Sequence, residues 1–210
     1  MGRYLGSSCK HCRREGMKLF LKGARCWTAK CPVEKRQKSL APGMHGWRRG
    51  RPSEYGIRLR EKQKVKRFYG IFERQFIRYF HRAEKAKGNT GQNLLQLLER
   101  RLDNVVYKLN FAASRKAARQ FITHGHVYVN GHKVDLPDYS VDVGDKILVK
   151  NTEKSTKKAK QQLDQNPNFA TQAWLQLDRA KPEATVVSLP TRDDIQIPVE
   201  EQLVVEFCSR

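Results

Sequence analysis

Apolar residues recur every three or four positions through the middle of the chain, which is the spacing that lines one face of a helix. The pattern predicts four helices, over 54–68, from Phe72 to Gly88, over 93–109 and over 114–123. Ser53 and Ser114 precede two of these helices, and their hydroxyl groups are suited to accept N-cap hydrogen bonds. Gly70 separates the first two helices, and Gly88 suits the position just after the second because glycine adopts positive φ without a steric penalty.

Alternation of apolar and polar residues replaces the helical spacing after Gly125, which closes the fourth helix. The segments 126–129 and 132–135 alternate on either side of Asn130 and Gly131. This pair favours a type I′ hairpin turn, in which both central residues have positive φ. Further short strands are expected over 146–150, 174–177, 186–189 and 203–207.

Helices followed by short antiparallel strands predict an α+β fold. Four segments are expected: a cysteine-rich, metal-bound N-terminal extension over 1–45, a basic helical domain over 46–98, a module of short helices packed on a small antiparallel sheet over 99–160, and a C-terminal segment over 161–210 that packs back on the body. The polar stretch 151–172 indicates a frayed helix or a linker.

The chain carries 42 Lys and Arg residues against 21 Asp and Glu, which gives a formal net charge of +21. Such an excess opposes compaction by self-repulsion unless a polyanion neutralises it, and nucleic acid is the most common polyanion. The excess lies early in the chain, because residues 1–90 carry 25 basic and 6 acidic residues. The last fifty residues are mildly acidic, so the early part is the part suited to phosphate.

Neither membrane insertion nor secretion is expected. No segment approaches the length of about 18 consecutive apolar residues that a membrane span needs, and residues 1–10 lack the apolar core of a signal peptide. We therefore expect the chain to stay in the compartment where it is made, the cytoplasm. In a reducing compartment, five cysteines favour metal ligation or free thiols over disulfides.

Four of the five cysteines form two close pairs, Cys9 with Cys12 and Cys26 with Cys31. Two pairs joined by a loop can place four thiolates at the corners of a tetrahedron, which is the geometry that zinc prefers. We therefore expect one zinc ion per chain, organising a segment too poor in apolar residues to build a core. A four-cysteine iron–sulfur cluster uses the same ligands, and four unligated thiols are the simpler alternative. Cys208 is isolated and is expected to be a small hydrophobic residue of the tail.

Candidate nucleic-acid contacts fall into three groups. The first surrounds the cysteines and comprises Arg3, Lys10, Arg13, Arg14 and Lys22. The second lies between residues 47 and 67 and comprises Trp47, Arg48, Arg49, Arg51, Arg58, Arg60, Lys64 and Arg67. The third lies in the fourth helix and the hairpin and comprises Ser114, Arg115, Lys116, Arg119, His124, His126 and Asn130.

The second and third groups each have an ordinary structural alternative. The stretch 47–67 holds only Glu54 and Glu61 as acids, which favours phosphate binding over a solvated helix face. Trp47 could stack on a base. In the third group the helix N-terminus offers N–H groups to a phosphate, and Arg115 and Arg119 lie four positions apart on one face. Either arginine taken alone could be no more than an exposed charge.

Residue patterns typical of enzymes are missing from the sequence. There is no P-loop, no G-x-S-x-G elbow and no H-E-x-x-H pair. His124, His126 and His132 are close in sequence, but a glycine separates the first two, so an RNA-facing or satisfied surface role is favoured over catalysis. The sequence therefore predicts that the protein is not an enzyme.

Several stretches resemble the family of ribosomal protein four of the small subunit. In the proposed module these are RLDNVVYKL at 101–109, ASRKAARQ at 113–120, HGHV at 124–127 and VNG at 129–131. Elsewhere they are RYLG at 3–6, RREG at 13–16, APGMHG at 41–46, LREKQK at 59–64 and EQLVVEF at 201–207. The four cysteines resemble the metal-containing variant of the family, although many members lack them.

The resemblance implies a structural constituent of the small ribosomal subunit, with 99–160 as the RNA-binding module named after the family. Such a protein would bind the ribosomal RNA at a multi-helix junction in its 5′ domain and nucleate assembly of the subunit body. The resemblance also implies contact with the fifth small-subunit ribosomal protein, at an interface that influences translational accuracy. Arg48, Arg49 and Arg51 match a basic cluster beside the path by which messenger RNA enters. Some members also repress translation of their own operon.

Two other classes of function fit parts of the pattern. An RNA-modifying enzyme with an appended RNA-binding module would need a catalytic domain, for which 210 residues leave little room. A zinc-containing DNA-binding factor would instead prefer duplex DNA over folded RNA. Direct competition between the two nucleic acids separates it from a ribosomal RNA-binding protein.

Overall fold

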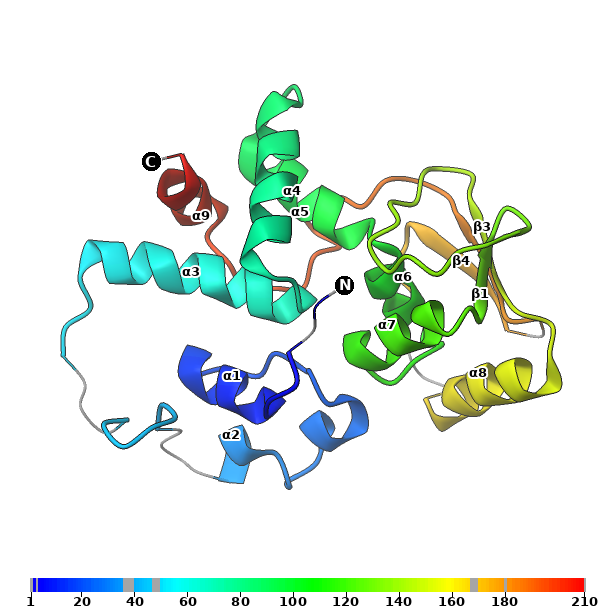
Figure 1. Cartoon of the computed structure of the whole chain (residues 1–210), viewed down its shortest axis with the longest axis horizontal. Coiled ribbons are helices and arrows are strands. Elements are labelled where there is room, and N and C mark those ends of the chain that lie inside the picture. The colour runs from blue at the N-terminus through cyan, green and yellow to red at the C-terminus, as the bar shows by residue number, and fades with distance from the viewer. Residues whose placement is uncertain are drawn as a thin grey trace. The chain divides into compact units, whose positions relative to one another are not determined.

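The computed structural model describes residues 2, 4–35, 40–46, 50–166, 170–179 and 181–209. The chain forms two compact units (Figure 1), unit 1 with residues 1–94 and 197–210 and unit 2 with residues 95–196. The residues after 160 are thus divided between the two units. Within the described ranges, no helix is both long and apolar enough to cross a membrane.

Unit 1 is built from helices in its described residues. These are α1 (Ser8–Glu15), the 3₁₀ helix η1 (Gly23–Trp27), α2 (Pro32–Lys35), α3 (Glu54–Tyr69), α4 (Glu73–Lys85), the first half of α5 (Thr90–Glu99), and α9 (Glu201–Cys208). The Oγ of Ser53 accepts a hydrogen bond from the backbone N–H of Gly56 at 3.1 Å, which caps α3. Gly70 ends α3 with a φ of 68°. Both predicted ends of this helix are therefore confirmed.

The C-terminal helix α9 packs against α3 within unit 1. The rings of Tyr55 and Phe207 lie 5.3 Å apart, and Arg58 forms an ion pair with Glu206. The prediction of a strand over 203–207 is wrong. So short an apolar run fits the spacing of either element, and packing against α3 selects the helix.

Unit 2 packs helices on a sheet that has five antiparallel strands in the described residues. Its elements are the second half of α5, α6 (Leu102–Lys108), α7 (Arg115–Thr123), β1 (Val127–Val129), β2 (His132–Lys133), β3 (Lys146–Val149), α8 (Glu153–Gln165), β4 (Leu175–Asp178) and β5 (Glu183–Val186). The strand order is β2-β1-β3-β5-β4. Leu102, Ile122, Ile147 and Trp174 are buried in its core. The predicted α+β class is confirmed.

The hairpin predicted at Asn130 and Gly131 is present. The two residues have φ values of 50° and 82°, as a type I′ turn requires. Tyr128 pairs with Lys133 across the turn, so strands β1 and β2 are held in the register that the sequence predicts. The hairpin lies directly after α7, which fixes the position of the residues at the end of that helix.

The helix predicted over 93–109 is broken into α5 and α6. Arg101 has extended backbone with φ −65° and ψ 134°, and it forms a β-bridge with Ser140. Its guanidinium is fully buried and donates two hydrogen bonds to Asp103, at 3.0 and 2.7 Å. The sequence conceals this break because leucine and valine continue on both sides of it.

Two other predicted boundaries differ from the structure. Helix α4 ends at Lys85 with Ala86 in extended backbone, so Gly88 does not terminate it. Strand β5 covers Glu183–Val186 instead of 186–189, because its pairing with β3 places Ala184 opposite Ile147. Long-range pairing sets this boundary, and local composition does not reveal it.

Candidate nucleic-acid interface

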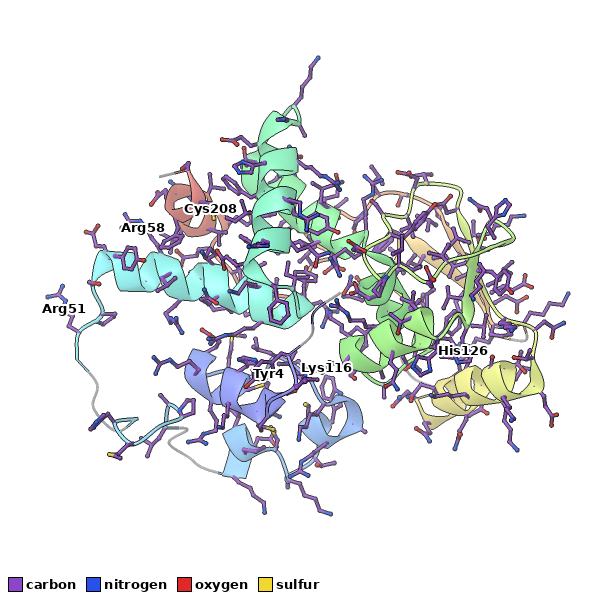
Figure 2. All side chains as sticks on the ribbon, in the orientation of Figure 1. Tyr4, Arg51, Arg58, Lys116, His126 and Cys208 are labelled. Atoms are coloured by element: carbon purple, nitrogen blue, oxygen red, sulfur yellow. The ribbon has the colours of Figure 1, made fainter. Side chains whose placement is uncertain are left out.

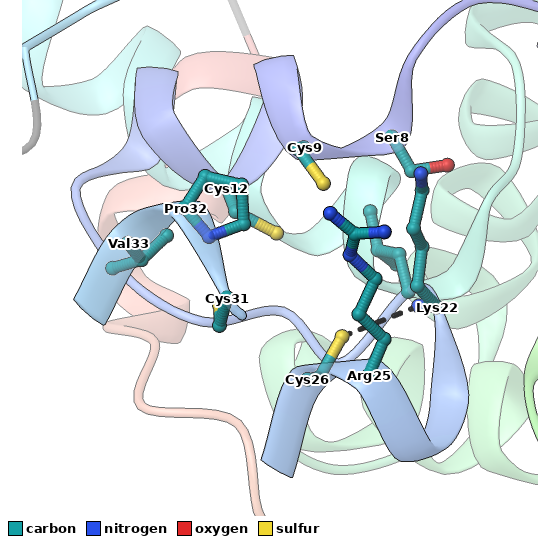
Figure 3. A pocket seen from close by; sticks show the side chains of 10 residues that line it. Ser8, Cys9, Cys12, Lys22, Arg25, Cys26, Cys31, Pro32 and Val33 are labelled. Atoms are coloured by element: carbon teal, nitrogen blue, oxygen red, sulfur yellow. Dashed lines mark hydrogen bonds between the residues drawn. The ribbon is translucent and has the colours of Figure 1, made fainter. Parts of the chain in front are cut away.

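The four N-terminal cysteines line one pocket in unit 1, together with residues of η1 and the start of α2 (Figure 3). Cys9 and Cys12 lie on α1, Cys26 lies on η1, and Cys31 directly precedes α2. Three of the four are at least 92% buried, and Cys9 is half-buried. The two predicted pairs are therefore brought together, although 13 residues separate them in the sequence.

The surroundings of the cysteine pocket act on the thiols in opposite directions. The backbone N–H of Lys22 donates to the Sγ of Cys26 at 3.4 Å (Figure 3). Burial raises the pKa of the Cys12 and Cys26 thiols, while backbone hydrogen bonds from Leu19 and Lys22 oppose that rise. In the described part of the chain, no three Cys, His, Asp or Glu side chains have metal-binding geometry. The donor set and its N–H partners fit a metal, but ligation requires the thiols to turn toward one centre.

The first group of predicted contacts surrounds the cysteine pocket. Lys10 and Arg14 are exposed on α1, Lys22 is exposed before η1, and Arg13 is half-buried. In the second group, Arg51 is exposed ahead of α3 and extends away from it (Figure 2). The remaining predictions of Arg3, Trp47, Arg48 and Arg49 lie outside the described residues.

The cations predicted on α3 are largely engaged within unit 1. Arg58 pairs with Glu54 and Glu206, and Lys64 pairs with Glu61. The other two, Arg60 and Arg67, both pair with Glu15 of α1, whose side chain is 1% exposed. These ion pairs hold α1 and α9 on α3, so the four cations are partly neutralised by the protein itself. Their role in RNA binding stays a prediction.

Two of the residues predicted on α7 have structural tasks. Ser114 caps the helix, its Oγ accepting from the backbone N–H of Ala117 at 3.3 Å. Arg115 is only 8% exposed, and its guanidinium lies 4.6 Å from the ring centre of Tyr107. The sequence places Arg115 and Arg119 on one face, but the structure buries the first and leaves the second half-buried.

Three other predicted RNA-contact residues are exposed on α7, at its end and in the hairpin turn that follows. Lys116 is exposed in the first turn of the helix (Figure 2). His124 is exposed at the opposite end, where it is the C-cap residue. Asn130 is exposed in the hairpin turn, but its amide donates to Asp145 at 2.7 Å and its carbonyl oxygen accepts from the backbone N–H of Lys146 at 2.9 Å. The structure therefore uses Asn130 to hold the turn.

Two lysines that the sequence analysis did not name, Lys150 and Lys158, lie near the predicted contacts His124 and His126. The Nδ1 of His126 is 2.9 Å from the Oγ of Ser155 on α8. Burial lowers the pKa of His126, and the nearby charges of His124, Lys158 and Lys150 lower it further. We call Lys150, Lys158 and the two histidines the His126 cluster. Only the packing of α8 beside α7 brings Lys158 to this place, and the sequence signal for it is the buried stripe of Ser155, Ala159 and Leu163.

Sequence comparisons place this geometry in context. Residues 3–99 match the family model described as ribosomal protein S4/S9 N-terminal domain, and residues 100–147 match the model of the S4 domain. The chain is 56% identical to the small ribosomal subunit protein uS4 of Halothermothrix orenii over 210 residues, which covers all of both chains. It is 51% identical to the corresponding protein of Desulforamulus reducens and 52% identical to that of Thermoanaerobacter sp. strain X514, again over the full length of both chains.

Proposed function

The chain belongs to the family of small ribosomal subunit protein uS4, and we propose that it acts there by binding RNA phosphates with cations of both units. It is a structural component of the small ribosomal subunit and not an enzyme. As in its family, its partner is the RNA of that subunit.

The observation that carries the phosphate-binding mechanism is the uneven pairing of charge. The α3 cations meet carboxylates within unit 1. Lys150 and Lys158 of the His126 cluster form no ion pair with any described residue, and neither does Arg14 on α1. Cations without a carboxylate partner repel one another in the free protein, and an RNA backbone relieves that repulsion.

The proposed mechanism of RNA binding is the rigid placement of cationic side chains. Helix α7 is fixed by its Ser114 cap and by the buried Arg115, so Lys116 is presented from a stable element. RNA helices repel one another where they meet, and cations fixed at such a place hold them together. We propose that this place is a multi-helix junction in the 5′ domain of the ribosomal RNA. Binding there would nucleate assembly of the subunit body.

The same proposal includes two further neighbours in the ribosome, one protein and one RNA. We propose contact with the fifth small-subunit ribosomal protein, through which the chain would influence translational accuracy. We also propose that Arg51 and its basic neighbours Arg48 and Arg49 lie near messenger RNA where it enters the ribosome. The exposure of Arg51 supports its part in this contact. We propose that the chain resides in the cytoplasm, within the ribosome.

We propose further that Cys9, Cys12, Cys26 and Cys31 hold one zinc ion. A four-thiolate zinc ion cross-links the segments that carry its ligands, which contributes folding free energy and no redox chemistry. The cross-link would join α1, η1 and the start of α2. The shared pocket and the N–H donors from Leu19 and Lys22 support this assignment.

A filter-binding titration tests the proposed function. The RNA is a fragment of the ribosomal 5′ domain, and a scrambled RNA of equal length is the competitor. Preference for the fragment by about a hundredfold or more is the expected result for a specific ribosomal RNA-binding protein. If about eight phosphates are contacted, log K falls against log[salt] with a slope of roughly −6 to −7. Equal affinity for the two RNAs would contradict the proposal.

A further inference from the structure

A second hollow of unit 1 is lined almost entirely by cations. Its lining residues are Arg13, Arg25, Lys30, Pro32 and Lys35. They come from α1, η1, the turn before Cys31, and α2, so four separate pieces of backbone converge on it. We call this hollow the basic pocket. Its lining contains no carboxylate.

The protein leaves the basic pocket without compensating charge. Residues 1–46 contain only two acids, Glu15 and Glu34. Glu15 is committed to the arginines of α3, and Glu34 pairs with Lys18. Across the residues that the structure describes, none of the four pocket cations has an ion-pair partner. Four like charges around one hollow repel one another, and an anion bound there would offset that repulsion.

The donors of the basic pocket match a phosphate group. Two guanidinium groups offer paired N–H donors in the planar geometry that suits phosphate oxygens, and two ammonium groups add point charges. The Nε of Arg13 already donates to the carbonyl oxygen of Leu40 at 3.1 Å, which holds this side chain in place. We propose that the basic pocket binds one phosphate group of the RNA backbone. This inference rests on the proposed function, because it names a contact of that same RNA.

The pocket is tied to the cysteines through the sequence. Arg13 follows Cys12, Arg25 precedes Cys26, and Lys30 precedes Cys31. Arg25 also lines the cysteine pocket (Figure 3). Whatever fixes the cysteines therefore fixes the backbone of three of the four cationic residues. The cysteine segment serves to hold a phosphate site in shape.

Phosphate ethylation interference on the 5′-domain fragment tests the pocket. The double variant Lys30→Gln/Lys35→Gln removes two exposed cations, and Lys85→Gln/Lys87→Gln at the end of α4 is the matched control. Ethylation at one or two adjacent phosphates should block binding of the wild-type chain and of the control. The pocket variant should lose that sensitivity alone, with a salt slope shallower by roughly 0.7–0.9. The charge-retaining variant Lys30→Arg/Lys35→Arg should recover it.

The outcomes separate the pocket from the proposed function. Full preference for the 5′-domain fragment, with an interference map identical in wild type and pocket variant, would overturn the pocket and leave the function standing. Loss of sensitivity at every phosphate, in the pocket variant and the control alike, would also overturn it. A wild-type chain without preference for the fragment would instead refute the proposed function.

Discussion

The Nε of Arg115 donates a hydrogen bond of 2.8 Å to the side-chain oxygen of Asn104, which is itself fully buried. The amide nitrogen of Asn104 in turn donates to the backbone oxygen of Glu99 at 3.0 Å. A residue that the sequence assigns to the RNA surface is thus part of an interior network that joins α7 to α6 and α5. We therefore expect Arg115 to influence RNA binding through the position of α7.

Replacing Arg115 should therefore cost stability. Arg115→Ala leaves the oxygen of Asn104 without its buried donor, which should lower the free energy of unfolding by about 2–4 kcal/mol. Urea denaturation measures the change. The matched variant is Lys116→Ala, one position along on the exposed side, which should leave stability unchanged and weaken RNA binding. An Arg115→Ala chain of full stability would contradict the structural role.

The His126 cluster should contribute to RNA affinity. Lys150→Gln/Lys158→Gln removes two cations that lack a carboxylate partner among the described residues. The salt slope should become shallower by roughly 0.7–0.9 for each phosphate that the variant no longer binds. The control Lys157→Gln/Lys160→Gln removes equal charge from α8, the helix that carries Lys158, and those lysines line a mixed-charge hollow with Asp164. Equal changes in both variants would mean that positive charge in this part of the chain attracts RNA regardless of its position.

The lowered pKa of His126 predicts a pH dependence of stability. Burial, with the charges of His124, Lys158 and Lys150, makes the folded state bind the proton less readily than the unfolded state. Stability should therefore be complete above about pH 6.5, the ordinary histidine pKa, and fall as the pH falls below it. A bound phosphate would raise the pKa of His126, because its negative charge favours the protonated ring. RNA affinity should therefore rise as the pH falls, whereas stability falls.

Urea titrations at pH 7.5 and pH 5.5 measure this effect. His126→Gln should lose less stability between the two pH values than wild type, and His132→Gln in the hairpin should behave as wild type. Proton NMR of the His126 ring should also report a pKa that rises on RNA binding. A pKa of His126 at or above the ordinary value in the free chain would refute the prediction.

The cysteine cluster should retain zinc through purification. Metal analysis should find about one zinc per chain, and Cys31→Ser should weaken zinc affinity by roughly tenfold or more because one of four ligands is lost. Cys208→Ser is the control, since Cys208 lies on α9 and does not line the pocket. Iron with inorganic sulfide in place of zinc would favour the iron–sulfur alternative. A metal-free, fully folded chain would contradict both.

Local sequence patterns correctly predicted the element ends that are set by neighbouring side chains. The Ser53 and Ser114 caps and the turn at Asn130 each depend on a few neighbouring residues, and each is present. The break at Arg101 and the helix α9 depend on partners distant in the sequence, so periodicity alone missed them.

In the candidate site, too, the sequence revealed local features and missed those that depend on residues distant in the chain. Composition finds basic residues but cannot tell a buried arginine from an exposed one, so Arg115 and Lys116 look alike in the sequence. Nor can it show that Arg60 and Arg67 share the carboxylate of Glu15. Convergence of Lys30 and Lys35 on one hollow follows from the fold of the cysteine segment, which has no periodic pattern to reveal it.

Hydroxyl-radical footprinting of the intact small-subunit ribosomal RNA tests whether fixed cations of the chain bind its backbone at a junction. The chain, added alone at physiological salt, should protect a compact set of backbone positions where several helices of the 5′ domain meet. Lys116→Ala and Lys150→Gln/Lys158→Gln should each lose a separate part of that protection. Scattered protection across the RNA, or protection that survives both variants unchanged, would contradict binding by fixed cations at a junction.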